Sequence, residues 1–254
     1  MTKNRIKLII TLSILNIIFG LKNLSGQIPD IQNIFEQGNK FYEQGNFNEA
    51  IVNYELLISK GVNDKSVYYN LGNAYYRIKS LGKSILNYER AHKLSPRDED
   101  INYNLNFVRT FVKEQEDNIL YKIIDSFTMN ELTLFVSITY FILVACLIIY
   151  MFYKNIILKW IMFSFGYLLI ISLILFYSKY TIQEKTIKGI VITTPAEART
   201  GPGDDYSVGF TLPEGKKVII LTEKNGWYAI AVKQAEPQPV MLKGWLQKHL
   251  IEKI

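Results

Sequence analysis

The longest apolar stretches of the chain lie in its middle. Residues 132–153 form 22 consecutive positions without a charge, and residues 160–178 form a second run of 19. At 1.5 Å per residue, the first run makes a helix about 33 Å long, enough for the hydrocarbon core of a bilayer. A buried helical hairpin of a soluble protein is the alternative, but two adjacent runs of this length are rare there. The pattern therefore predicts two membrane-spanning helices.

The N-terminal segment 1–26 has the layout of a secretory signal. Three basic side chains precede an apolar stretch at 8–21, which is short for a membrane span. Cleavage next to Gly26 is one outcome. An uncleaved anchor is the other, because the residues before this point are larger than signal cleavage prefers. Both outcomes export the residues that follow.

Charges around the two central runs predict their orientation. The connecting segment 154–159 carries Lys154 and Lys159, whereas 113–131 carries two lysines against five acids. Because short loops rich in lysine stay in the cytoplasm, both flanking parts are expected outside the bacterial inner membrane, in the periplasm. The juxtamembrane segment 118–131 has an apolar stripe that fits either the membrane interface or a continuing helix.

In the part of the chain before the apolar runs, small and large side chains recur at a spacing of 34 residues. Gly38 and Gly72 are one such pair, and each lies inside a stretch with helical spacing of apolar residues. The same offset relates Ala50 to Ser84, Tyr54 to Tyr88 and Phe41 to Tyr75. A glycine within a helix costs about 1 kcal/mol relative to alanine, so its recurrence indicates helices packed closely together. The period predicts helix–turn–helix repeats.

These positions resemble those of the tetratricopeptide repeat (TPR) family. The second repeat carries most of the pattern, at Tyr68, Leu71, Gly72, Tyr75, Ser84, Tyr88, Ala91 and Pro96. The first repeat departs at Val62, where a proline is usual. A third start has Asn106 in place of the glycine, and we interpret it as a capping helix. The resemblance implies a TPR domain over 27–117.

The same resemblance implies a protein-binding groove. Asn39 and Asn70 match the asparagines with which some TPR domains hold a partner's terminal carboxylate. The cations of such clamps are missing, since Phe35, Asp100 and Asn104 occupy their places. An unpaired carboxylate would gain little here, so we expect an apolar or amide-rich partner segment. The candidate groove residues are Phe35, Asn39, Tyr69, Asn70, Asn73 and Tyr76.

After a linker at 179–188 the pattern changes to short strands. Apolar, β-branched and aromatic stretches alternate with turn signals over 189–254, which predicts a small all-β barrel. The stretches "EARTGPG", "LPEGKKVIIL", "NGWYAI" and "KGWLQKHLI" resemble the bacterial SH3 (SH3b) domain, although the loop "KQAEPQPVML" is longer than usual. Such domains bind peptides or cell-wall material. The candidate contacts are Arg199, Asp204, Asp205 and Tyr228. The barrel core is the alternative for Tyr228 and the expected place of Trp227.

The inventory of reactive side chains argues against an enzyme. The two histidines, His92 and His249, have no cysteine or carboxylate at metal-ligand spacing, and we expect His92 on a solvated surface. No nucleophile motif or phosphate-binding loop is present. The net charge of +6 lies largely in segment 1–26, so a nucleic-acid partner is not expected. We expect no catalytic residue, cofactor or metal.

The order of these parts identifies a candidate family. A signal, a TPR pair, two spans and an SH3b domain, with "LSPRDEDINYNLNFVRT" after the second repeat, resemble the E-type proteins of the Bacteroides aerotolerance (Bat) operon. The resemblance implies a multi-domain inner-membrane scaffold. Its implied partners are von Willebrand A-domain membrane proteins and a MoxR-type AAA+ ATPase. A sensor or tether that reads peptidoglycan peptides is the alternative.

Overall fold

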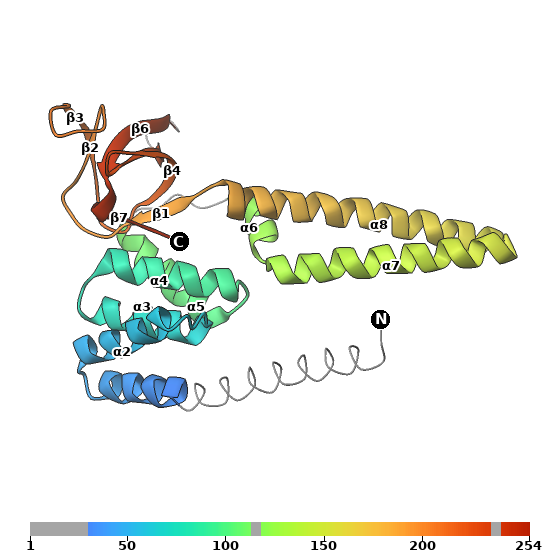
Figure 1. The fold of residues 1–254 in the computed structure, drawn as a ribbon, viewed down its shortest axis with the longest axis horizontal. Helices are drawn as coiled ribbons and strands as arrows, with labels where there is room; N and C mark the ends of the chain where they lie inside the picture. Colours follow the sequence, from blue (N-terminus) through green and yellow to red (C-terminus); the bar gives the residue numbers. More distant parts are fainter. Residues whose placement is uncertain (1–29, 113–117, 235–239) are drawn as a thin grey trace, which may run out of the picture.

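The computed structural model describes residues 30–112, 118–234 and 240–254, shown in Figure 1. The expected signal segment, 1–26, lies outside the described residues. Helical residues 30–43 lead into α2 (Phe47–Ser59), α3 (Lys65–Arg77), α4 (Leu81–Leu94), α5 (Glu99–Arg109), the 3-10 turn η1 (Thr110–Val112) and α6 (Ile119–Asp125). Side chains cap several of these helices. Asp64 accepts a hydrogen bond from the Ser66 amide at 2.7 Å, which satisfies a free N–H group at the start of α3.

Two glycines allow the repeat helices to pack as the sequence predicts. A Cβ atom on Gly72 would lie 2.8 Å from the Tyr88 ring, and one on Gly38 would lie 2.7 Å from the Tyr54 ring. Ser84 is fully buried in the same contact and donates to the Gly72 carbonyl at 2.9 Å. A larger residue at either glycine would displace the tyrosine ring, so these glycines fix the distance between paired helices.

The two apolar runs form a long helical hairpin. α7 (Met129–Tyr153) and α8 (Ile156–Tyr180) lie side by side and project away from the rest of the chain (Figure 1). Both are long and apolar enough to cross a membrane, and their side chains are mostly exposed. Lys159 lies inside α8, so the turn is shorter than the expected loop at 154–159. A Thr128–Glu131 capping box begins α7.

The C-terminal part is an antiparallel half-barrel of seven strands. Its order is β3-β2-β6-β5-β4-β1-β7, and a π-helical segment η2 (Thr181–Lys185) joins it to α8. The strands are β1 (Lys188–Val191), β2 (Ala196–Arg199), β3 (Val208–Leu212), β4 (Lys217–Lys224), β5 (Trp227–Gln234), β6 (Val240–Gln247) and β7 (Ile251–Lys253). Trp227 is buried, as expected from the sequence.

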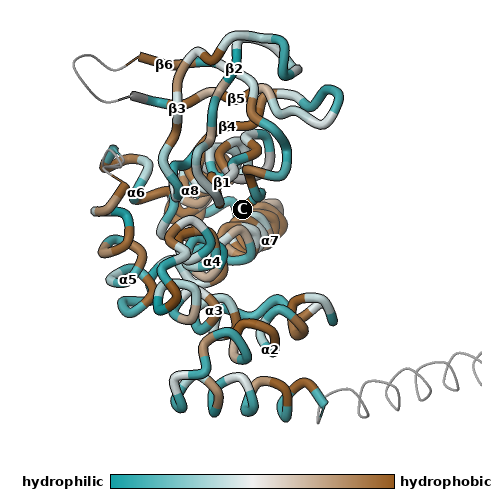
Figure 2. Tube along the Cα trace, turned by 90° about the vertical axis from the view of Figure 1, so that its left-hand side faces the viewer, coloured by the Kyte–Doolittle hydropathy of each residue, from teal (hydrophilic) through white to brown (hydrophobic). Residues whose placement is uncertain are grey.

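The sheet packs directly against the last repeat. Figures 1 and 2 both place it beside α4, at the end of the repeat stack away from α2. Ile190 of β1 is fully buried in one cluster with Ile85 of α4 and Val108 of α5. The Gly82 amide donates to Glu214 at 2.7 Å across the same contact. The sequence pattern suggested two separate modules, but the repeats and the sheet share a core.

A buried ion cluster lies at the centre of this contact. Glu89 of α4 forms salt bridges with Arg109 of α5 and, at 2.6 Å, with Lys217 of β4. Only 8% of its side chain is exposed. Burial alone would raise the pKa of Glu89, but the two cations outweigh it and lower the pKa from 4.5 to about 2. Glu89 therefore stays ionised while the sheet is docked.

We predict that Glu89→Gln lowers the unfolding temperature near neutral pH. Because the native pKa is lowered, the carboxylate stabilises the fold above about pH 4.5, and this contribution is lost as the pH falls toward 2. The full contribution is of the order of 3 kcal/mol. Unfolding of the detergent-solubilised chain at pH 6 and pH 3 measures it, with Glu36→Gln as the exposed control. Equal stability of Glu89→Gln and wild type at pH 6 would contradict the buried cluster.

Candidate functional site: an amide-lined groove

The inner face of the repeats contains two adjoining cavities of about 190 Å³ each. Tyr42 and Asn73 border both cavities, so the two form one groove along the repeat face. The remaining lining residues are Asn39, Glu43, Tyr54, Asn70, Tyr76, Tyr88, Tyr103, Asn104, Phe107 and Val108. The groove thus combines amides with aromatic rings.

Asn39 is held by two neighbours in the first half of the groove. Its Oδ1 accepts from the Tyr54 hydroxyl at 2.8 Å and from Asn70 Nδ2 at 2.9 Å. Burial raises the pKa of Tyr54 to about 12, so its hydroxyl keeps the proton that it donates. These contacts fix the orientation of the Asn39 amide.

The same arrangement recurs one repeat later. Asn73 Oδ1 accepts from the Tyr88 hydroxyl and, at 3.1 Å, from Asn104 Nδ2. Asn104 Nδ2 also donates to the Tyr69 hydroxyl at 2.9 Å. Burial raises the pKa of Tyr88 well above its usual range. The repeat therefore duplicates a hydrogen-bonded pair of amides as well as a helix pair.

Some amide nitrogen and oxygen atoms in the groove make no hydrogen bond to another described residue and could bond to a ligand. Within the part of the chain that the structure describes, no hydrogen bond is recorded for Nδ2 of Asn39 or for Oδ1 of Asn70 and Asn104. Donors and acceptors therefore both line one face, with rotamers fixed from behind. An extended peptide backbone offers the complementary N–H and C=O groups.

Aromatic rings form one end of the groove. Tyr76 meets Phe107 edge-on with ring centroids 5.8 Å apart, and Phe107 meets Phe111 in the same way at 5.4 Å. Tyr103 beside them is 73% exposed. Exposed rings clustered in this way give a partner's apolar side chain a surface on which to pack.

Charge on the groove has one sign. Among the residues that line the two cavities, Glu43 carries the one charge. No lysine or arginine lines them, so a clamp for a carboxylate or phosphate is missing from this described surface. This agrees with the expectation drawn from Asp100 and Asn104. A carboxylate without a neighbouring cation in the lining disfavours an acidic ligand.

The predicted groove residues divide into two groups. Asn39, Asn70, Asn73 and Tyr76 line the cavities. Tyr69 is half-buried behind Asn104, where its ring packs on Tyr88, and Phe35 packs against Tyr54 at the core.

The sequence analysis missed several lining residues, and the repeat register could have identified three of them. These are Tyr42, Tyr103 and Phe107. Each lies one repeat period of 34 residues from a predicted groove residue, namely Tyr76, Tyr69 and Asn73, respectively.

The candidate contacts on the sheet have structural roles or are buried. Tyr228 is only 3% exposed and belongs to the sheet core, which agrees with the core alternative and leaves little of its side chain for a ligand. Arg199 donates to the carbonyl oxygens of Asp204 and Tyr206, each at 2.8 Å, and so braces the turn. Asp205 is exposed. Arg199, Asp204 and Asp205 thus lie together at one turn, whereas Tyr228 lies in the core.

Two further observations concern the site chemistry. Among the described residues, no group of three or more His, Cys, Asp and Glu side chains could hold a metal ion. His92, expected on a solvated surface, is instead half-buried and hydrogen-bonded to Asn102 and Asp125.

Comparison with protein families matches part of the repeats. Residues 38–79 match the model of a TPR repeat family. The match contains Asn39, Tyr42, Asn70, Asn73 and Tyr76, and so covers much of the groove. No curated protein matches the chain. TPR repeats indicate a role in protein–protein interaction, and this chain's N-terminal region is TPR-like.

Proposed function

We propose that this chain is a non-catalytic adaptor whose repeat groove binds an extended segment of a partner protein. The row of four asparagines carries the proposal, because they line the groove with fixed rotamers, and Asn39, Asn70 and Asn104 each keep an amide atom that makes no recorded hydrogen bond. Ordering these amides before binding avoids part of the entropy cost that a flexible surface would incur. The TPR match over the same residues supports it.

The partner segment is neutral or basic and carries an apolar side chain. The amides hold its backbone, which gives affinity for many sequences. Selectivity comes from the aromatic end at Tyr76, Tyr103 and Phe107, and from Glu43, which favours a nearby cation. An acidic segment would leave its charge without a partner.

We predict that the full chain in detergent retains neutral and basic members of a library of short random peptides. Tyr103→Ser should weaken the retained peptides about tenfold, as expected for loss of one aromatic anchor. Glu43→Lys should shift retention toward acidic peptides. Val52, 64% exposed on α2 and outside the groove lining, provides the control Val52→Ser. Retention unaffected by Tyr103→Ser and Glu43→Lys would refute binding in this groove.

We further propose an orientation for the membrane hairpin. Lys154 and Lys159 favour a cytoplasmic turn, so the repeats and sheet would lie in the periplasm at the inner membrane. The core that the repeats and the sheet share supports a location of both on the same side of the membrane. Two spans, α7 and α8, would return the chain to the side from which it entered.

This orientation can be measured with single cysteines on exposed positions. Ser66→Cys on α3 and Lys224→Cys on β4, each with Cys146 replaced by serine, should react with an impermeant thiol reagent in spheroplasts. Lys154→Cys in the turn should react only after lysis. The reverse pattern would exclude a periplasmic location.

We also propose that the chain is an E-type protein of a Bat operon with an SH3b-type sheet, and the order of its parts supports this. Its partners would be von Willebrand A-domain proteins and a MoxR-type ATPase system. The alternative, a sensor of peptidoglycan peptides, draws less support, because Tyr228 is buried and Arg199 braces its own turn. Co-sedimentation with purified peptidoglycan distinguishes them: binding that survives Tyr103→Ser would favour the alternative.

A further inference from the structure

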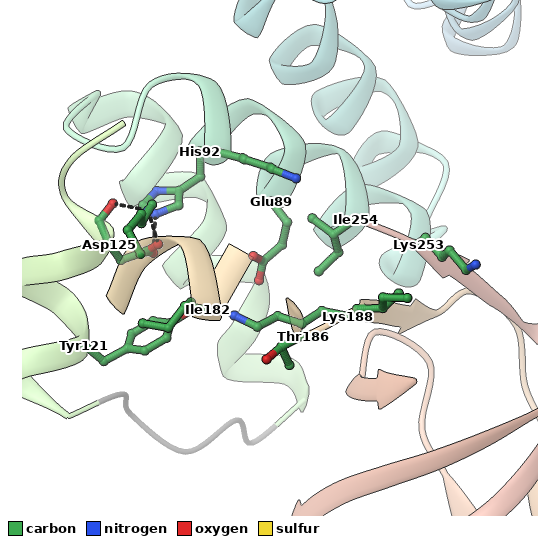
Figure 3. A pocket seen from close by; sticks show the side chains of 12 residues that line it. Glu89, His92, Tyr121, Asp125, Ile182, Thr186, Lys188, Lys253 and Ile254 are labelled. Atoms are coloured by element: carbon green, nitrogen blue, oxygen red, sulfur yellow. Dashed lines mark hydrogen bonds and ion pairs between the residues drawn. The ribbon is translucent and has the colours of Figure 1, made fainter. Parts of the chain in front are cut away.

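A chain of polar contacts joins the repeats to the membrane hairpin. His92 on α4 contacts Asn102 Oδ1 through Nδ1 at 2.7 Å and Asp125 Oδ2 through Nε2 at 2.9 Å. Figure 3 shows the His92 ring and the Asp125 carboxylate facing each other from α4 and α6. Lys179, near the end of α8, completes the chain by donating to Asp125 Oδ1 at 2.8 Å.

Each partner of the His92 ring is an acceptor. Asn102 Nδ2 donates to the Pro96 carbonyl at 2.9 Å, which turns its Oδ1 toward His92. Burial alone would raise the pKa of Asp125, but hydrogen bonds from His92 and Lys179 hold it well below its usual range, so its oxygens are charged acceptors. Only an imidazolium can donate from both nitrogens at once.

A neutral ring would lose one of these contacts. With the proton on Nδ1, the Nε2 lone pair would face the Asp125 carboxylate. With the proton on Nε2, the Nδ1 lone pair would face Asn102 Oδ1, and turning that amide would break its bond to Pro96. Both hydrogen bonds of the ring can therefore form only when both of its nitrogens are protonated, that is, when His92 carries a positive charge.

The contacts cross a boundary between two bodies. His92 and Asn102 belong to the repeats, whereas Asp125 and Lys179 belong to α6 and α8 at the base of the hairpin. The Lys179 side chain is only 5% exposed, and its Nζ also donates to the Asp125 carbonyl at 3.1 Å. α6 is thus fixed to α8, and His92 then attaches the repeats to both. Two contacts that do not involve the histidine cross the same boundary, the bond from Lys188 Nζ to the Tyr121 hydroxyl at 2.8 Å and the Arg97–Glu131 salt bridge.

A cavity of about 300 Å³ borders this chain of contacts. His92 is 19% exposed, so solvent protons reach it. Glu89 also faces the cavity, but Arg109 and Lys217 already neutralise it. The other charged or titratable groups around the cavity are Lys93 on α4, Tyr121 on α6, Lys188 on β1 and Lys253 on β7.

We propose that His92 is a proton-operated latch between the repeat–sheet body and the membrane hairpin. Protonated His92 holds α4 and α5 on α6 and α8. Loss of the proton breaks one of its two hydrogen bonds and so weakens the attachment of the body to the hairpin. The latched state binds one proton more than the open state, so latching strengthens as the pH falls.

Spin labels on the two bodies test this in the full chain. Ser66→Cys on α3 and Tyr153→Cys at the end of α7, with Cys146 replaced by serine, give a distance across the latch in nanodiscs. The distance distribution should be narrow at pH 5.5. At pH 8 the open population should rise about tenfold, as expected for loss of a hydrogen bond to a charged group.

The chain contains a matched control, because it has two histidines. His92→Gln should make the distance independent of pH, whereas His249→Gln, on the exposed turn before β7, should leave the pH dependence intact. A pH response that survives His92→Gln, or a wild-type distance unchanged between pH 5.5 and pH 8, would overturn the proposal.

A second measurement needs no change at His92. In protein labelled with ¹⁵N-histidine, the ring nitrogens of His92 should give imidazolium shifts at pH 5.5 in the latched state. At pH 8 the neutral shifts should accompany the open distances. A neutral His92 ring at pH 5.5, with the narrow distance retained, would exclude the latch.

Discussion

A buried carboxylate decides how the two soluble halves of this chain fit together. Glu89 lies between Arg109 and Lys217, and an ionised group in this position is tolerated only while both cations remain beside it. Removing the sheet would take away Lys217 and uncover Ile85 and Val108. The sheet therefore acts as the cap that the end of a repeat array requires.

This arrangement leaves the groove open while fixing its walls. The sheet covers the end of the repeats beyond α4, whereas the amides lie on the inner face formed by residues 30–43, α3 and α5. The tyrosines that fill the space over Gly38 and Gly72 also orient Asn39 and Asn73. Helix packing and the orientation of the groove amides thus depend on the same side chains.

The sequence allowed some of this to be predicted, for identifiable reasons. Local periodicity and the constant offset between repeats determine the helices, the paired glycines and the groove asparagines. The docking of the sheet on the repeats was missed because nothing in the sequence alone distinguishes Glu89, Arg109 and Lys217 from ordinary surface charges. His92 was missed for the same reason, since Asp125 and Lys179 reach it only through folding. Tyr228 was left open between a ligand contact and the barrel core, because an aromatic residue in a strand fits either face of a sheet.

The central claim is that the repeats and the sheet form one body, and contacts between isoleucine methyl groups test it directly. In methyl-labelled full-length protein in detergent, Ile85 of α4 and Ile190 of β1 should show a nuclear Overhauser effect, since both are fully buried in one cluster. Ile85→Val would assign the signal. If the cross-peak were absent while both methyl groups gave sharp signals, the sheet would not be docked on the repeats, and the account of a shared core would be contradicted.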